Sequence, residues 1–289
     1  MRLYGKTEKL RHFPKWVLAA VIIVGGWLVI AARHQAAAPD PVPGKAPNTQ
    51  AELRASTAPI APEDDNSAFV TLTDVVPDAI LEIRYYSTFN FVGDRIDGYL
   101  EPTALLTKRA ADSLRAVSDD LMARGYRLKI FDAYRPQRAV DHFRRWASDA
   151  SDTRMKPYFY PDLPKSLLFK QGYISARSGH TRGSTVDLTL FDMNTEKEVD
   201  MGGTFDWLGP ESHPGFCGDP ATGRYTGDNS KSPTGRSITP EQFRNRMILR
   251  QAMMRHGFKP IGTEWWHFTL RNEPFPDTYF TFPVEQIKR

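Results

Sequence analysis

Cysteine is the scarcest residue of this 289-residue chain, which has a single copy at Cys217. One cysteine excludes an intrachain disulfide framework and any zinc site built on paired thiolates. We expect Cys217 to be a buried or loop thiol without a redox or catalytic part. A metal site in this chain must therefore draw its ligands from His, Asp and Glu.

Net charge is also absent once the first fifteen residues are set aside. The chain has 38 Lys+Arg and 34 Asp+Glu, for a formal net charge of +4. Residues 1–15 contain five basic residues and one acidic residue, so the other 274 residues hold 33 basic and 33 acidic side chains. This balance removes the basic surface on which nucleic-acid binding depends. We expect no nucleic-acid partner.

Charged residues are missing altogether from residues 16–32, which read WVLAAVIIVGGWLVIAA. Seventeen helical residues span roughly 26 Å at about 1.5 Å per residue, near the lower limit for crossing a bilayer. The basic residues before them predict a cytoplasmic segment 1–15 and export of the following chain. We favour a retained single-pass anchor in a bacterial inner membrane, with the rest of the chain in the periplasm. The alternative is a signal peptide cleaved near Ala38, which would leave a secreted periplasmic protein.

Aromatic residues are absent from residues 33–66, which contain eight Ala and six Pro. This composition cannot build a hydrophobic core and predicts a flexible Pro/Ala-rich linker. The chain changes character at about residue 67, and no internal repeat follows. We expect residues 67–289 to form one compact domain.

Hydrophobic periodicity predicts both helices and strands in this domain. Apolar residues recur every three or four positions from Leu106 to Leu121, whereas apolar and polar residues alternate from Tyr126 to Ile130. We expect helices over 106–121, from Pro136 through Ala147 and from Thr239 to Gly257, and strands over 126–130 and 258–270. The elements do not alternate as regular strand-helix-strand units, so we predict the α+β class.

The segment Ser178-Gly-His-Thr-Arg-Gly-Ser-Thr-Val-Asp-Leu-Thr-Leu190 places His180 and Asp187 seven residues apart. Gly179 and Gly183 give the backbone freedom to fold between them. In a strand, Val186 and its alternate neighbours would face the core, and Asp187 would face out of the apolar layer. A loop histidine and a carboxylate in a surface ion pair would also explain this segment.

Two further segments carry chemistry. Glu264-Trp-Trp-His-Phe268 sets a carboxylate and an imidazole beside an apolar wall, and a regular strand would turn Glu264 and His267 to opposite faces. A shared site would therefore need a bend or bulge there. Phe131-Asp-Ala-Tyr-Arg-Pro136 places Arg135 at a strand-to-helix junction. A core Trp pair and an arginine packed on a carboxylate are the plain structural alternatives.

Together these segments supply three metal ligands, His180, Asp187 and His267, around an open fourth position. Three protein ligands and an open position are typical of catalytic rather than structural zinc. Glu264 is then the candidate general base, because a nearby carboxylate can take a proton from water held at such a metal.

The sequence resembles the D-alanyl-D-alanine dipeptidases of the VanX type, which are zinc peptidases related to D,D-carboxypeptidases. The resemblance runs from about Phe69 to Pro283. It rests on the His180 and Glu264 segments above, together with Asp97-Gly-Tyr99, Tyr134-Arg-Pro-Gln-Arg-Ala-Val140, Tyr158-Phe-Tyr-Pro161, Gly172-Tyr-Ile-Ser175, Met201-Gly-Gly-Thr-Phe-Asp206 and Tyr279-Phe-Thr-Phe-Pro283. It implies an α+β domain with a central antiparallel sheet flanked by helices, and one Zn²⁺ per subunit.

The resemblance also implies a role for each site residue. His180, Asp187 and His267 would bind zinc, Glu264 would be the general base, and Arg135 would stabilise the oxyanion. Tyr85 and Asp206 would meet the substrate ammonium, and Ser178 would help to hold its carboxylate.

The resemblance implies hydrolysis of free D-alanyl-D-alanine to two D-alanines. The alternatives are a D,D- or L,D-carboxypeptidase that trims peptidoglycan stem peptides and a non-catalytic cell-wall-binding protein. This chain departs from the family in its predicted membrane anchor and in Gly179, where a bulkier residue is expected before the metal histidine. The sequence leaves the oligomeric state open.

Overall fold

The computed structural model describes residues 65–288. The predicted cytoplasmic segment 1–15, the membrane segment 16–32 and all but the last two residues of the linker 33–66 lie outside the described residues. Across residues 65–288, every helix is too short or too polar to span a bilayer.

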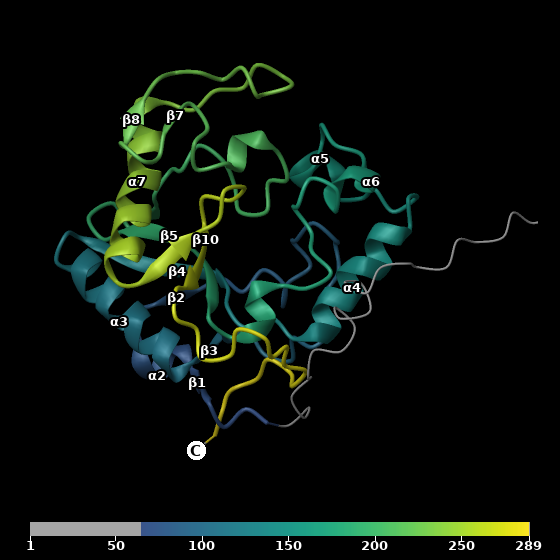
Figure 1. The fold of residues 1–289 in the computed structure, drawn as a ribbon, viewed down its shortest axis with the longest axis vertical. Helices are drawn as coiled ribbons and strands as arrows, with labels where there is room; N and C mark the ends of the chain where they lie inside the picture. The colour runs from purple at the N-terminus through teal and green to yellow at the C-terminus, as the bar shows by residue number, and fades with distance from the viewer. Residues whose placement is uncertain (1–64, 289) are drawn as a thin grey trace, which may run out of the picture. The chain divides into compact units, whose positions relative to one another are not determined.

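A mixed sheet forms the centre of this domain (Figure 1). Its path runs through β2 (Ile80–Leu81), β4 (Tyr126–Asp132), β5 (Thr185–Asp192), β10 (His267–Leu270) and β9 (Phe258–Pro260), and β6 (Lys197–Glu198) pairs with β5. The predicted antiparallel sheet is wrong at one pair, because β2 runs parallel to β4. The chain returns from β2 to β4 through a helix, and a helical crossover is the connection that permits parallel pairing.

Three long helices confirm the predictions from periodicity: α3 (Lys108–Met122), α4 (Gln137–Ser148) and α7 (Pro240–Arg255). The first begins two residues later than expected, because Leu105–Thr107 form β3, which pairs with β1 (Phe69–Thr71). A capping box starts α7: Thr239 Oγ1 accepts from the Gln242 backbone N–H at 3.1 Å, and Gln242 Oε1 accepts from the Thr239 N–H at 2.8 Å.

The helices cover both sides of the sheet. α3 packs against β4 and α7, and α7 packs against β9. In the view of Figure 1, α4 lies across the sheet from α3 and α7. The remaining elements are short: α2 (Leu72–Val75), α5 (Lys156–Phe159), α6 (Lys165–Leu168), the 3₁₀ turns η1 (Gly179–Arg182) and η2 (Pro210–Ser212), β7 (Gly218–Asp219) and β8 (Arg224–Tyr225).

The predicted strand 258–270 is wrong in its middle. The structure divides it into β9 and β10, which pair antiparallel with Phe268 opposite Pro260 and leave residues 261–266 as the connecting loop. Glu264 lies in this loop and His267 begins β10. A regular strand would turn Glu264 and His267 to opposite faces. The loop bends the chain so that both side chains can reach one site.

Asp187 projects from the face of β5 opposite to that of Val186 and Leu188, as expected, and this face is buried as well. Thr185, Asp187 and Thr189 are as inaccessible as the apolar residues between them. Long loops cover this face and bring Tyr85 and Asp206 over it. Cys217 is buried, as expected.

Candidate active site

Strand register places three polar residues side by side at one end of the sheet. Asp187 on β5 lies opposite His267 on β10 and opposite Asp132 on β4, where a bulge near Phe131 shifts the pairing. Directly opposed residues project to the same face of a sheet. The sheet itself therefore brings a carboxylate and an imidazole together from segments eighty residues apart in the chain.

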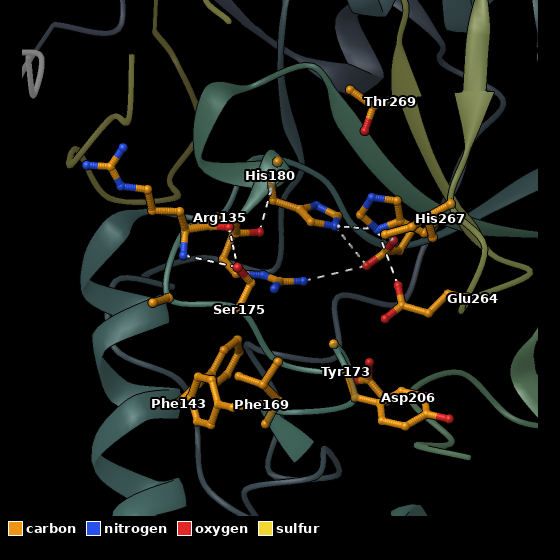
Figure 2. A pocket seen from close by; sticks show the side chains of 18 of the residues that line it. Arg135, Phe143, Phe169, Tyr173, Ser175, His180, Asp206, Glu264, His267 and Thr269 are labelled. Carbon is orange, nitrogen blue, oxygen red and sulfur yellow. Dashed lines mark hydrogen bonds and ion pairs between the residues drawn. The ribbon is translucent and has the colours of Figure 1, made fainter. Parts of the chain in front are cut away.

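His180 completes the cluster from the 3₁₀ turn η1. Its Nε2 lies 3.2 Å from Asp187 Oδ2 and 3.2 Å from His267 Nδ1, and His267 Nδ1 lies 3.1 Å from Asp187 Oδ1. Ligands at about 2.0–2.2 Å from a tetrahedral metal are separated from one another by about 3.3–3.6 Å. One nitrogen of each imidazole and the two oxygens of Asp187 therefore lie at nearly the separations that a shared tetrahedral metal requires (Figure 2).

The hydrogen bonds around the cluster suit a metal. His180 Nδ1 lies 2.7 Å from the carbonyl oxygen of Ala133, so this nitrogen carries the proton and Nε2 keeps its lone pair for a metal. Asp187 Oδ1 is buried, and it accepts no well-aligned hydrogen bond within residues 65–288, although His267 Nδ1 lies 3.1 Å away. A buried carboxylate oxygen needs a positive charge or a donor beside it, and a cation held between Asp187 and the two imidazoles would satisfy it.

The same cluster shifts the ionisation of its members. Burial alone would raise the pKa of Asp187, but His180 and His267 lower it below its ordinary value. Burial alone would lower the pKa of His267, yet the Asp187 and Glu264 carboxylates raise it to about 9. Without a metal ion, a protonated His267 imidazole therefore balances the negative charge of the neighbouring carboxylates.

Glu264 reaches the cluster from the β9–β10 loop. Its Oε2 lies 3.4 Å from His267 Nδ1, and its side chain is 15% exposed. Figure 2 shows the carboxylate projecting beside the two imidazoles and into the cavity. A carboxylate in this position has access to water next to a metal held by the three ligands.

Arg135 is fixed on the other side of the cluster, at the junction of β4 and α4. Its Nε donates to Asp132 Oδ2 at 2.9 Å, its Nη2 lies 3.6 Å from Asp187 Oδ2, and its guanidinium lies 4.8 Å from the centre of the Tyr85 ring. The plain interpretation of an arginine packed on a carboxylate is thus correct. The guanidinium packs on Asp132 and at the same time points toward the cluster of His180, Asp187 and His267.

Asp206 and Tyr85 form a second polar pair in the same cavity. Tyr85 Oη donates to Asp206 Oδ2 at 3.0 Å and both side chains are buried. Burial and the nearby charge of Asp187 raise the pKa of Asp206. A positively charged group placed against Asp206 would stabilise its ionised form.

Ser178 caps η1, where its Oγ accepts from the His180 backbone N–H at 3.3 Å. Its own O–H remains available as a donor. The cavity has a volume of about 530 Å³ and is lined by all eight residues predicted from the sequence: Tyr85, Arg135, Ser178, His180, Asp187, Asp206, Glu264 and His267.

Asp132 is the functional candidate that the sequence analysis missed. It is buried, accepts from Tyr99 Oη at 2.6 Å and from Arg135, and lies 3.5 Å from His180 Nδ1. It thereby orients both Arg135 and His180, which is one of the candidate metal ligands. The sequence feature that could have indicated Asp132 is its position three residues before Arg135, at the same strand-to-helix junction.

This α+β fold, with two imidazoles and a carboxylate converging beside a glutamate, is that of a metallopeptidase. A family model described as D-ala-D-ala dipeptidase matches residues 65–224 and 228–285. The chain belongs to this family.

Individual relatives agree with the family model. The chain is 37% identical over 216 residues to a D-alanyl-D-alanine dipeptidase of Streptomyces coelicolor and 35% identical over 218 residues to one of Enterococcus faecalis. Each match covers 75% of this chain and 98% of the relative. A D-alanyl-D-alanine dipeptidase of Escherichia coli is 30% identical over 206 residues, which is 71% of this chain and 86% of the relative.

Proposed function

We propose that this chain is a zinc-dependent dipeptidase that hydrolyses D-alanyl-D-alanine to two D-alanines. The main support is the convergence of His180, Asp187 and His267, whose nitrogen and oxygen atoms approach one another to 3.1–3.2 Å in a cavity that also contains Glu264, Arg135 and Asp206. The relatives named above carry the same activity in their names.

Two imidazoles and one carboxylate form a donor set that suits Zn²⁺. When bound, zinc supplies a Lewis acid that polarises the scissile carbonyl and lowers the pKa of water toward about 7. His180, Asp187 and His267 would hold it and leave its fourth position facing the cavity.

Glu264 is the proposed general base. It takes a proton from the attacking water and returns it to the leaving nitrogen, which is the usual double use of one carboxylate. Its partial burial beside His267 keeps it within reach of the reacting atoms.

Arg135 is the proposed oxyanion stabiliser. Asp132 holds its Nε, so the guanidinium is positioned before substrate arrives and its other N–H groups remain for the developing negative charge. Burial makes the interaction stronger than it would be in water.

The two ends of the dipeptide have separate proposed partners. Asp206, supported by the Tyr85 hydroxyl, meets the substrate ammonium, and the Ser178 hydroxyl donates to the carboxylate. A buried carboxylate that needs a cation to ionise favours a substrate with a free amino group over one whose nitrogen is acylated.

The test offers the purified protein free D-alanyl-D-alanine and a muramyl pentapeptide that ends in the same two residues. We expect release of D-alanine from the dipeptide at a rate that far exceeds release from the pentapeptide. Cleavage of the pentapeptide alone would instead identify a carboxypeptidase. Cleavage of neither by a fully metal-loaded protein would favour a non-catalytic cell-wall-binding role.

We also propose that residues 16–32 anchor the enzyme in the inner membrane, with the catalytic domain in the periplasm. The support is the uncharged segment and the basic residues before it. Protease added to spheroplasts should digest the domain, and the protein should remain with washed membranes. Release of a chain that starts near Pro39 would show cleavage of a signal peptide instead.

A further inference from the structure

A second cavity, of about 300 Å³, lies next to the active site. Its lining comes from the 210–220 loop, from Lys231, from Arg250 on α7 and from the β9–β10 loop. Ile261 lines both cavities. The two spaces are therefore neighbours, separated by the loop that carries Glu264.

The second cavity is positively charged and has no acidic residue in its lining. Its ionisable residues are His213, Lys231 and Arg250. Arg250 and Lys231 make no ion pair or side-chain hydrogen bond within residues 65–288. Burial lowers the pKa of Arg250, but the side chain of an arginine stays charged at neutral pH. A half-buried cation without a partner is a receptor for an anion.

The cavity has a fixed wall. Arg246, one helical turn before Arg250, is buried; its Nε donates to the Met201 carbonyl at 2.7 Å and its Nη1 to those of Glu211 and His213 at 2.9 and 3.3 Å. These bonds tie the loop containing His213 to α7. The loop that contains His213 and the helix α7, which carries Arg250, are thereby held in fixed positions relative to each other.

A direct contact links the two cavities. Tyr173, which lines the active site, places its Oη 3.2 Å from His213 Nε2, and His213 lines the second cavity. Figure 2 shows Tyr173 on the same side of the active site as Glu264. A molecule in the second cavity would therefore contact Ile261, which also lines the active site, and His213, which contacts Tyr173 of the active site.

We propose that the second cavity binds a carboxylate carried on a short apolar stem. Arg250 and Lys231 pair with the carboxylate, and the stem packs on the apolar part of the lining: Pro210, Pro214, Phe216, Pro220, Pro260 and Ile261. This chemistry has two sources. One is a free small carboxylic acid, and the other is an acidic group at the end of a longer peptide that enters from the active site.

The first arm of the test measures binding of butyrate to the metal-loaded protein by calorimetry, with butyramide as its uncharged counterpart. We expect butyrate to bind, butyramide to bind at least tenfold more weakly, and R250Q and K231Q each to weaken butyrate about tenfold. R244Q is the matched control, because Arg244 is an exposed arginine on α7 that does not line the cavity. If butyrate binds instead at the metal of the active site, R250Q should leave its affinity unchanged, because Arg250 does not line that cavity.

The second arm rests on the proposed function and compares N-succinyl- and N-acetyl-D-alanyl-D-alanine as inhibitors. If the carboxylate belongs to an extended peptide, R250Q weakens the succinyl compound about tenfold and leaves the acetyl compound unchanged. The proposal is overturned if R250Q changes the binding of neither butyrate nor the succinyl compound. Hydrolysis of D-alanyl-D-alanine by R250Q should match the wild type, so failure of the cavity proposal is distinct from failure of the proposed function.

Discussion

Glu264 and His267 are three residues apart, and their side chains meet because the chain turns into β10 between them. Glu264 Oε2 lies 3.4 Å from His267 Nδ1, but Glu264 is not one of the three residues that could share a metal ion, which are His180, Asp187 and His267. Two neighbouring residues thus have separable tasks. His267 would hold the metal, and Glu264 would move a proton.

Replacing Glu264 by Gln should separate these tasks. We expect kcat to fall by about 10²–10⁴-fold, because the amide cannot accept the proton of water. Metal content should stay near one per chain, since none of the three ligands changes. The measurements are steady-state hydrolysis of D-alanyl-D-alanine and metal analysis, with Glu241→Gln on the exposed start of α7 as the control. Near-normal turnover with full metal would exclude Glu264 as the base.

The proton on His267 predicts how metal binding depends on pH. The metal-free site has a His267 pKa of about 9, above its ordinary value, so at pH 7 this imidazole is protonated and must lose its proton to bind a metal. We expect release of about one proton per metal at pH 7, and an affinity that rises roughly tenfold per pH unit up to about pH 9. Calorimetric titration in buffers of different ionisation enthalpy measures the released proton. An affinity independent of pH between 6 and 8 would contradict this assignment.

At the scale of elements, the short turn η1 holds His180 against the sheet, and Gly183 is what lets the chain leave that turn. Gly183 has φ +78°, and a Cβ there would come within 2.2 Å of the Phe69 ring. Both the left-handed backbone and the close ring require glycine at this position.

Gly183→Ala should therefore be severely destabilising, by on the order of 3 kcal/mol, and should also weaken metal binding through His180. Gly172→Ala is the matched control, because Gly172 has φ +79° but no atom within 4 Å of the added methyl group. It should cost only about 1 kcal/mol. Urea unfolding of both variants gives the comparison. Equal losses would show that the contact with Phe69 is unimportant.

For the molecule as a whole, the candidate metal site joins β5 and β10 to η1, so metal binding and folding should be coupled. A ligand that binds only the folded state stabilises it by about 4 kcal/mol at a free concentration a thousandfold above its Kd.

Removal of the metal by a chelator should lower the melting temperature by roughly 10 °C for a domain of this size, and added Zn²⁺ should restore it. Scanning calorimetry of the two forms checks this. The His267→Ala variant should melt at a temperature that responds little to chelator. A wild-type melting temperature unaffected by chelator would argue against a structural contribution of the metal.

The sequence by itself determined the local elements and the residue types of the chemistry. Periodicity and caps act over a few residues, so α3, α4 and α7 were predictable, and a single cysteine restricted the possible ligands to His, Asp and Glu. The eight candidate site residues came from short segments and a family resemblance.

Only the tertiary structure decided what depends on contacts between distant segments. The parallel pairing of β2 with β4, the hairpin of β9 and β10 and the burial of Asp187 follow from strand register and loop packing, which local periodicity does not encode. The place of Asp132 behind Arg135 and His180 was hidden for the same reason. A sequence pattern shows which groups are available, but the distances that turn them into a site are fixed by the sheet that brings β4, β5 and β10 side by side.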